Sequence, residues 1–249
     1  TERVSHLRQD ANCMASTSDN AICVTVFASS TPQTSATFAQ ASAEFGRLLA
    51  QAGGVAIFGG GNAGCMGAFY EGAFKAGGRV RGITHRMFVK PGGSSLSEEN
   101  AAELESLEIV EGRDLTVRKR RLLDAADCLV ALPGGVGTFD ELWMAIAELG
   151  VGCGDLPVLL LNVDGYYDGS IQQLMRAGKE GMLRRPWTEY VTIVDTPMDA
   201  VTWCVMQKRR AKVPAKPRAM NDYCKGVIHG AIIAAAALLL TAAGLRRHT

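Results

Sequence analysis

The sequence lacks the patterns of most metal sites and of nucleoside triphosphate sites. Its 249 residues include only four histidines, with no HExxH or comparable spacing, so we expect no metal site built on histidine. No GK[ST] follows a glycine-rich stretch, which excludes a P-loop. The seven cysteines form no CxxC pair, and such a scattered, odd set is typical of reduced, buried thiols.

An excess of charge is also missing. The formal net charge is +1, so no overall field favours nucleic acid, and we expect no nucleic-acid partner. Residues 1–20 are polar and contain no apolar signal core, and we interpret them as an N-terminal extension. The chain has no internal repeat. Apolar residues make up 47% of it, which is ample for a buried core.

Short apolar runs alternate with amphipathic stretches along most of the chain. Most runs are continuous, which is typical of parallel strands covered on both faces. We predict strands at residues 21–28, 55–58, 79–83, 107–110, 128–132, 157–162 and 191–194. This alternation predicts an α/β fold over residues 21–207: a doubly wound, mostly parallel, Rossmann-like sheet in a three-layer αβα arrangement. Ligands of such sheets bind beyond the carboxyl ends of the strands.

Two glycine-rich turns follow predicted strands. The first, FGGGNAGCMG, runs from Phe58 to Gly67, and the second, PGGVGT, runs from Pro133 to Thr138. Glycine lets the backbone approach a phosphate, and the next helix N-terminus offers amides and positive potential. One such turn is more often a packing turn. Two in one sheet, with a third turn of small residues at 28–31, favour phosphate binding.

An NAD-dependent oxidoreductase is disfavoured. The first turn fits GxGxxG only loosely, and no clear acidic residue ends the next predicted strand to bind a ribose.

Basic residues crowd the predicted helix before residue 128. They are Arg113, Arg118, Lys119, Arg120 and Arg121. A helix cannot point all of them one way, so we expect most to form a solvated face. Arg118 differs because it lies near the helix start, beside the expected ligand position.

Two carboxylates follow the second glycine turn. We predict that the helix here begins with Thr138 as its N-cap. Asp140 then compensates the helix dipole, and Glu141 completes a capping box with Thr138. Alternatively, a free carboxylate beside a phosphate turn binds ribose hydroxyls, orients water or stabilises an oxocarbenium ion. The spacing does not separate these alternatives.

These stretches resemble one known family. FGGGNAGCMG fits the pattern GGGxxGxMG, and RK followed by LPGGVGTFDE fits RK…PGGxGTxxE. Both patterns are typical of the Lonely Guy family of cytokinin riboside 5′-monophosphate phosphoribohydrolases, formerly labelled lysine decarboxylase-like. The run LLLNVDGYYD is also similar, so the resemblance covers roughly residues 21–206.

The resemblance implies a Rossmann-like homodimer that hydrolyses a purine nucleoside 5′-monophosphate, cytokinin-type or plain AMP. The products are a free base and ribose 5-phosphate, and neither a cofactor nor a metal is implied. It assigns catalysis to Arg118 and Glu141, with Glu141 facing the ribose. The implied substrate-binding residues are Gly60, Gly61, Asn62, Gly64, Met66, Lys119, Gly134, Gly135, Gly137 and Thr138.

Some positions depart from the family pattern. Thr116 and Val117 stand where plant members usually carry His-Glu, and Val136 replaces the tyrosine of PGGYGT. Thr84 and His85 stand where the family often has Ile-Pro. These departures bear on the choice of base more than on the phosphate site.

An alternative function is a non-catalytic module that binds a nucleotide or carries molybdenum cofactor. The joint presence of Arg118 and Glu141 favours the enzyme.

The C-terminal part differs in composition. Residues 208–226 are basic and punctuated by proline, which predicts a linker. From Val227 to Leu245 no residue carries a formal charge, and a helix over this stretch would be about 28 Å long, close to the thickness of a bilayer core. We predict an apolar helix in residues 227–249. It either anchors a cytoplasmic catalytic domain to an intracellular membrane or packs on the core or across a dimer.

Overall fold

The seven predicted strands form one parallel sheet. The computed structural model describes residues 21–89 and 103–211, with side chains up to residue 207. The strands are β1 Cys23–Phe27, β2 Val55–Phe58, β3 Arg79–His85, β4 Ser106–Val110, β5 Cys128–Ala131, β6 Val158–Leu161 and β7 Thr192–Val194. Their order is β4-β3-β2-β1-β5-β6-β7, and each neighbouring pair is parallel. The predicted α/β fold is confirmed.

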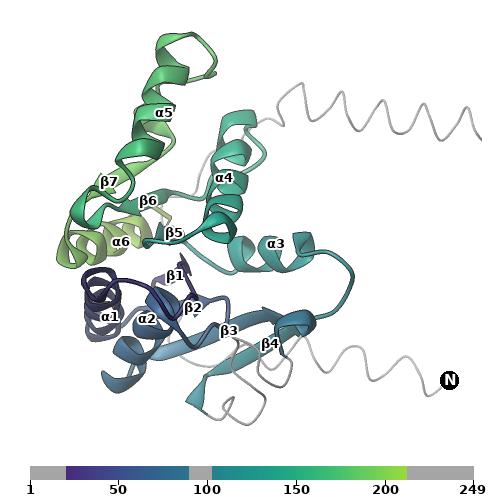
Figure 1. Ribbon diagram of the computed structural model, residues 1–249, viewed down its shortest axis with the longest axis vertical. Helices are drawn as coiled ribbons and strands as arrows, with labels where there is room; N and C mark the ends of the chain where they lie inside the picture. Colours follow the sequence, from purple (N-terminus) through teal and green to yellow (C-terminus); the bar gives the residue numbers. More distant parts are fainter. Residues whose placement is uncertain (1–20, 90–102, 212–249) are drawn as a thin grey trace, which may run out of the picture.

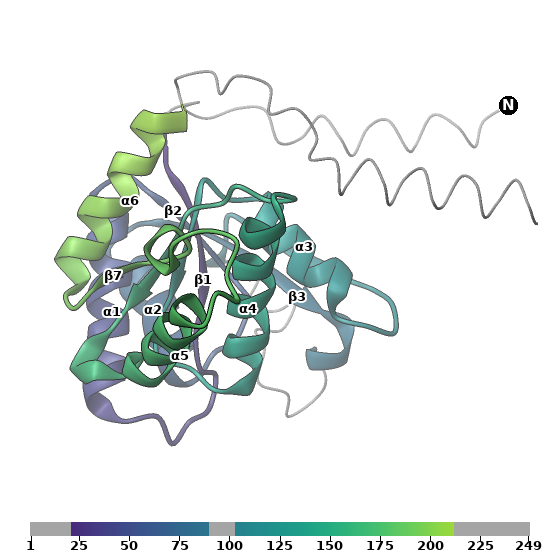
Figure 2. The ribbon, with the colours of Figure 1, turned by 90° about the horizontal axis from the view of Figure 1, so that it is seen from above.

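Helices cover both faces of this sheet (Figure 1). One face carries α1 Ala36–Gln51, α2 Gly64–Lys75 and α6 Pro197–Ala211. The other face carries α3 Thr116–Asp124, α4 Val136–Val151 and α5 Asp168–Lys179. Short 3-10 turns occur at η2 Arg86–Phe88, η4 Val163–Gly165 and η5 Trp187–Glu189. Figure 2, a view from above, shows α1 and α6 on the opposite side of the sheet from α3 and α4.

Alternate residues of each strand enter two separate cores. In β1, Val24 and Val26 join the core under α1, α2 and α6, while Phe27 joins the core under α3, α4 and α5. This alternation explains the continuous apolar runs, because both faces of the strands are buried. Thr25 is polar but fully buried, and its hydroxyl donates a hydrogen bond to the Leu122 carbonyl at 2.5 Å. That bond fastens α3 to the sheet.

The chain reverses its direction of sheet growth at β1. Strands β2, β3 and β4 are added on one side of β1, and β5 then pairs with its other side. The turns after β1 and β5 lead to helices on opposite faces of the sheet and diverge. Such a switch point opens a crevice at the carboxyl ends of the strands.

Two predicted boundaries need correction. Helix α4 begins at Val136 with Gly135 as its N-cap, so the prediction that Thr138 caps this helix is wrong. Thr138 lies inside the helix, where its side chain folds back over Gly134: a Cβ on Gly134 would lie 2.1 Å from the Thr138 hydroxyl. The capping box with Glu141 therefore does not exist. Helix α6 also continues to Ala211, so the first residues of the predicted linker are helical.

Several predictions fall on other parts of the chain. The N-terminal extension, the rest of the linker and the apolar helix of residues 227–249 lie outside the described residues. Among the described helices, none combines the length and apolarity that a membrane span requires.

Candidate active site

A cavity of about 390 Å³ lies at the switch point. The turn after β1 contributes Ser29, Ser30 and Thr31, and the turn after β2 contributes Gly59 and Gly61. The start of α4, from Gly135 to Glu141, forms the opposite wall, and α3 closes the side with Arg118 and Lys119. Turns distant in sequence therefore meet where the sheet topology predicts a ligand.

Arg118 and Glu141 form a buried ion pair at the wall of this cavity. Arg118 Nη1 lies 2.8 Å from Glu141 Oε1, and the two side chains are only 7% and 10% exposed. Two further donors of Arg118 bind backbone carbonyls: Nε donates to Ile83 at 3.2 Å and Nη2 to Gly59 at 3.3 Å. The guanidinium is thus fixed by three protein acceptors, and the carboxylate is fixed by the guanidinium.

Burial dominates the electrostatics of Glu141. Loss of solvent raises the pKa of this carboxyl above its usual range, and the adjacent Arg118 offsets part of that rise. A carboxylate with a raised pKa beside a cavity is typical of functional sites. Glu141 is also buried although it lies in the first two turns of its helix, which is unusual for a residue that only compensates the helix dipole.

The second glycine turn presents open backbone to the cavity. A Cβ on Gly135 or on Gly137 would meet no atom within 4 Å. The amides of Val136, Gly137 and Thr138 lie in the first turn of α4, where a helix offers them no internal acceptor. Open amides at a helix N-terminus favour an anion.

The first glycine turn is filled by its own neighbours. The Gly61 amide donates to the Met66 sulfur at 3.2 Å, and the Met66 amide donates to the Ser29 carbonyl at 2.9 Å. Gly64 adopts a φ of +60°, and a Cβ there would lie 2.7 Å from the carbonyl oxygens of Ser29 and Thr31. This turn therefore packs against the turn after β1.

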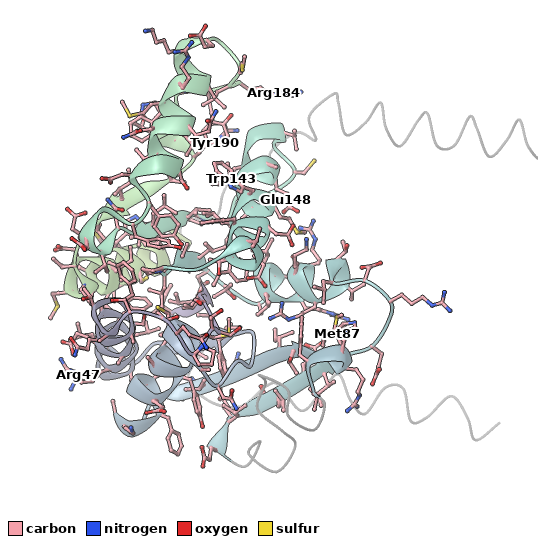
Figure 3. The ribbon with its side chains drawn as sticks, viewed as in Figure 1. Arg47, Met87, Trp143, Glu148, Arg184 and Tyr190 are labelled. Atoms are coloured by element: carbon pink, nitrogen blue, oxygen red, sulfur yellow. The ribbon has the colours of Figure 1, made fainter. Side chains whose placement is uncertain are left out.

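The other basic residues of α3 pair with acids on neighbouring elements. Lys119 Nζ lies 2.9 Å from Asp140 Oδ2, and both residues line the cavity. Arg120 pairs with Glu148, which Figure 3 labels on α4, and Arg121 lies 3.6 Å from Glu108. The expected solvated face is thus a set of ion pairs that joins α3 to α4 and β4.

Phe88 is a cavity residue that sequence reasoning missed. Its ring centroid lies 5.6 Å from the Arg118 guanidinium carbon, within cation–π range. It belongs to η2, which His85 caps by accepting a hydrogen bond from the Met87 amide at Nδ1, 3.2 Å away. The His85 Nε2 atom is buried and has no hydrogen-bond partner among the described residues. For Phe88, the position beyond the carboxyl end of β3 was the only feature of the sequence that could have indicated a place in the site.

Most of the predicted site residues line this one cavity. They are Arg118 and Glu141, together with Gly61, Met66, Lys119, Gly135, Gly137 and Thr138. Gly60, Asn62, Gly64 and Gly134 are not among the lining residues. No group of three or more His, Cys, Asp or Glu suited to a metal ion occurs within residues 21–89 and 103–211.

Comparison with known proteins supports the resemblance seen in the motifs. Residues 66–204 match the family model described as "Possible lysine decarboxylase". Over 186 residues the chain is 31% identical to the cytokinin riboside 5′-monophosphate phosphoribohydrolase of Mycobacterium tuberculosis (strain ATCC 25618 / H37Rv), covering 73% of this chain and 92% of that protein. The chain belongs to the Lonely Guy family. A probable phosphoribohydrolase of the same name from Oryza sativa subsp. japonica is 30% identical over 178 residues, which cover 72% and 70% of the two chains.

Solved structures share the fold of this chain. The molybdenum cofactor carrier protein of Chlamydomonas reinhardtii superposes with a TM-score of 0.54 at 19% identity, covering 76% of this chain and 99% of that one. At this identity the likeness concerns the fold alone.

Proposed function

We propose that this chain hydrolyses the N-glycosidic bond of a purine nucleoside 5′-monophosphate, either cytokinin-type or plain AMP, to a free base and ribose 5-phosphate. The observation that carries the proposal is the buried Arg118–Glu141 pair on the wall of a cavity that also contains an open helix N-terminus. The phosphoribohydrolase names of the relatives in two kingdoms support the same reaction class.

The 5′-phosphate binds at the start of α4 in this proposal. The amides of Val136, Gly137 and Thr138 donate to its oxygens, and the absence of a side chain at Gly135 and Gly137 allows close approach. Lys119 lies beside this position, paired with Asp140, and its ammonium group is a further N–H donor for the phosphate. Neither turn has the lysine and hydroxyl of a P-loop, so we expect triphosphates to be poor substrates.

Glu141 acts on the ribose. Cleavage passes through an oxocarbenium-like state, and a fixed carboxylate beside C1′ stabilises the developing positive charge. Only Oε1 of Glu141 is held by Arg118, so Oε2 accepts a proton from the water that attacks C1′. The bond between C1′ and the base nitrogen breaks, and the base leaves with the bonding electron pair and takes up a proton from solvent, to which Glu141 in turn releases the proton it accepted.

Arg118 holds this carboxylate in place. Three of its N–H groups are committed to Glu141, Ile83 and Gly59, which leaves others to contact the nucleotide. The proposed reaction uses only groups of the protein, without a cofactor or a metal. As in the sequence expectation, the active form is a homodimer, which light scattering on the purified protein tests directly.

The reaction requires Glu141 in its ionised form. Because burial raises its pKa, turnover should fall on acidification at a higher pH than for an ordinary glutamate, whose pKa is about 4.3. A profile of kcat/KM against pH checks this expectation. Activity that stays constant down to about pH 4 would contradict an ionised Glu141 as the reacting group.

A substrate panel tests the proposed function. AMP, isopentenyl-AMP and other nucleoside monophosphates are incubated with the protein beside the corresponding nucleosides, and free base and ribose 5-phosphate are quantified. We expect release from monophosphates and little from nucleosides. Tight binding of AMP without release of base would instead support a non-catalytic nucleotide-binding module. Equal turnover of adenosine and AMP would contradict the phosphate site.

A further inference from the structure

In the turn between β5 and α4, the backbone carbonyls of three successive residues each accept a hydrogen bond from a donor elsewhere in the chain. The Leu132 carbonyl accepts from the Tyr167 hydroxyl at 2.6 Å, and the Gly134 carbonyl accepts from the Tyr166 hydroxyl at 2.6 Å. Between them, the Pro133 carbonyl accepts from the Ser29 amide at 3.1 Å. Carbonyl oxygens repel an anion, so their orientation decides whether the following amides offer an attractive site.

The tyrosines come from one short connection, between β6 and α5. The Asn162 side chain accepts from the Tyr167 amide at 2.7 Å and donates to Asp168 at 2.9 Å, which fixes the connection on both sides. Asp164 has a φ of +52°, a left-handed conformation that costs free energy in a residue with a side chain. This local geometry directs two consecutive side chains to the same turn.

Packing fixes the two rings as well. Tyr167 is fully buried, and the Tyr166 ring lies edge-on to it at 5.2 Å. Tyr166 also contacts Phe38 of α1 edge-on at 5.2 Å. Burial raises the pKa of both phenols, so each hydroxyl keeps its proton and remains a donor at physiological pH.

We propose that Tyr166 and Tyr167 are positioning residues for the phosphate site, because their hydroxyls hold the carbonyls of Leu132 and Gly134 away from the cavity. Their effect on the ligand passes through the backbone of the turn: neither tyrosine is among the residues that line the cavity. This inference rests on the proposed function, since it takes the start of α4 as the phosphate site. It adds the residues that set the affinity of that site.

Tyr166→Phe is the primary test, because it removes one hydroxyl and keeps the ring. The loss of one hydrogen bond should weaken binding of ribose 5-phosphate about 3- to 10-fold. The KM for AMP should rise by a similar factor while kcat changes little, and binding of adenosine should stay unchanged. Tyr167→Phe should act in the same direction with a larger loss of thermal stability, since it leaves the Leu132 carbonyl buried without a donor.

Tyr190→Phe is the matched control. Tyr190 is a buried tyrosine whose ring contacts the Arg185 guanidinium, and it does not line the cavity. Its replacement should leave binding of ribose 5-phosphate at the wild-type value.

The outcomes separate this inference from the proposed function. Wild-type affinity for ribose 5-phosphate in Tyr166→Phe would overturn the positioning role and leave the proposed function standing. An equal loss of AMP and adenosine binding would also overturn it, because that pattern indicates general damage to the cavity. If the wild-type protein bound adenosine and AMP equally, both proposals would fail.

Discussion

The two glycine-rich turns of this protein look alike in sequence and differ in what surrounds them. In the turn after β2, Gly59 and Gly61 line the cavity, yet the glycines of this turn have close protein neighbours: the Gly61 amide donates to the Met66 sulfur, and Gly64 lies against neighbouring carbonyls. In the turn after β5, Gly135 and Gly137 face empty space in the cavity. Glycine serves close packing in the first turn and access for a ligand in the second.

The two turns are joined through one side chain. Arg118 donates to the Gly59 carbonyl of the first turn and to Glu141, one helical turn beyond the second. The first turn therefore supports the chemistry by holding Arg118, whereas the second supports binding by exposing amides. Substitutions in the two turns should change different kinetic constants.

The largest effect is expected at the residue that the second turn places beside the ribose. Glu141→Gln should lower kcat about 1000-fold or more, because an amide cannot offset positive charge or accept a proton from water. Nucleotide binding should persist. Glu148→Gln, which removes a carboxylate from the same helix outside the cavity, is the control. Near-wild-type turnover in Glu141→Gln would refute the catalytic role.

Gly64→Ala should give the next largest effect, on stability. Its φ of +60° disfavours a side chain, and the new Cβ would lie 2.7 Å from two carbonyl oxygens. We expect a loss of about 2–4 kcal/mol in the free energy of unfolding, measured by urea denaturation. A variant that stays as stable as wild type but loses phosphate binding would break the comparison, since the first turn would then be a ligand site.

Gly59→Ala should lower kcat and leave KM for AMP nearly unchanged. The added Cβ would lie 2.1 Å from Arg118 Nη2, so the guanidinium must move and Glu141 loses its support. We expect a decrease of about 10- to 100-fold in kcat, in line with the cost of misplacing a catalytic group by about 1 Å. A change confined to KM would indicate that this turn binds substrate directly.

Gly137→Ala should have the opposite kinetic effect to Gly59→Ala: it should change KM for AMP more than kcat. The position is helical and open, so alanine should stabilise the fold by up to about 1 kcal/mol. The methyl group would project into the cavity where the phosphate approaches, and KM for AMP should rise about 10-fold with little change in kcat, a factor that corresponds to about 1.4 kcal/mol of binding free energy. Unchanged KM in a stabilised variant would place the phosphate elsewhere.

The sheet was predictable because its signal is local. Continuous apolar runs bounded by turn residues marked all seven strands to within a few residues, and every pair is parallel as expected. β4 begins one residue earlier than predicted, at Ser106, and β3 extends two residues further, to Thr84 and His85. Both are polar yet buried, so hydropathy ended the strand too early.

The site was predictable in part. Position near a helix start distinguished Arg118 from its basic neighbours, and the motif indicated Glu141. The distance between them depends on how α3 and α4 pack, which no spacing reveals. The difference between the two glycine turns was also unpredictable, because a sequence shows that a side chain is missing but does not show which atoms surround the glycine. Thr138 is a second example: it packs over Gly134 inside a helix that begins at Val136, instead of capping that helix.

A structure of the Glu141→Gln variant with AMP tests the central claim most directly. We predict the phosphate within hydrogen-bond distance of the amides of Val136, Gly137 and Thr138, and C1′ of the ribose beside the side chain at position 141. A phosphate bound to the turn after β2, near Gly61 and Gly64, would contradict the account.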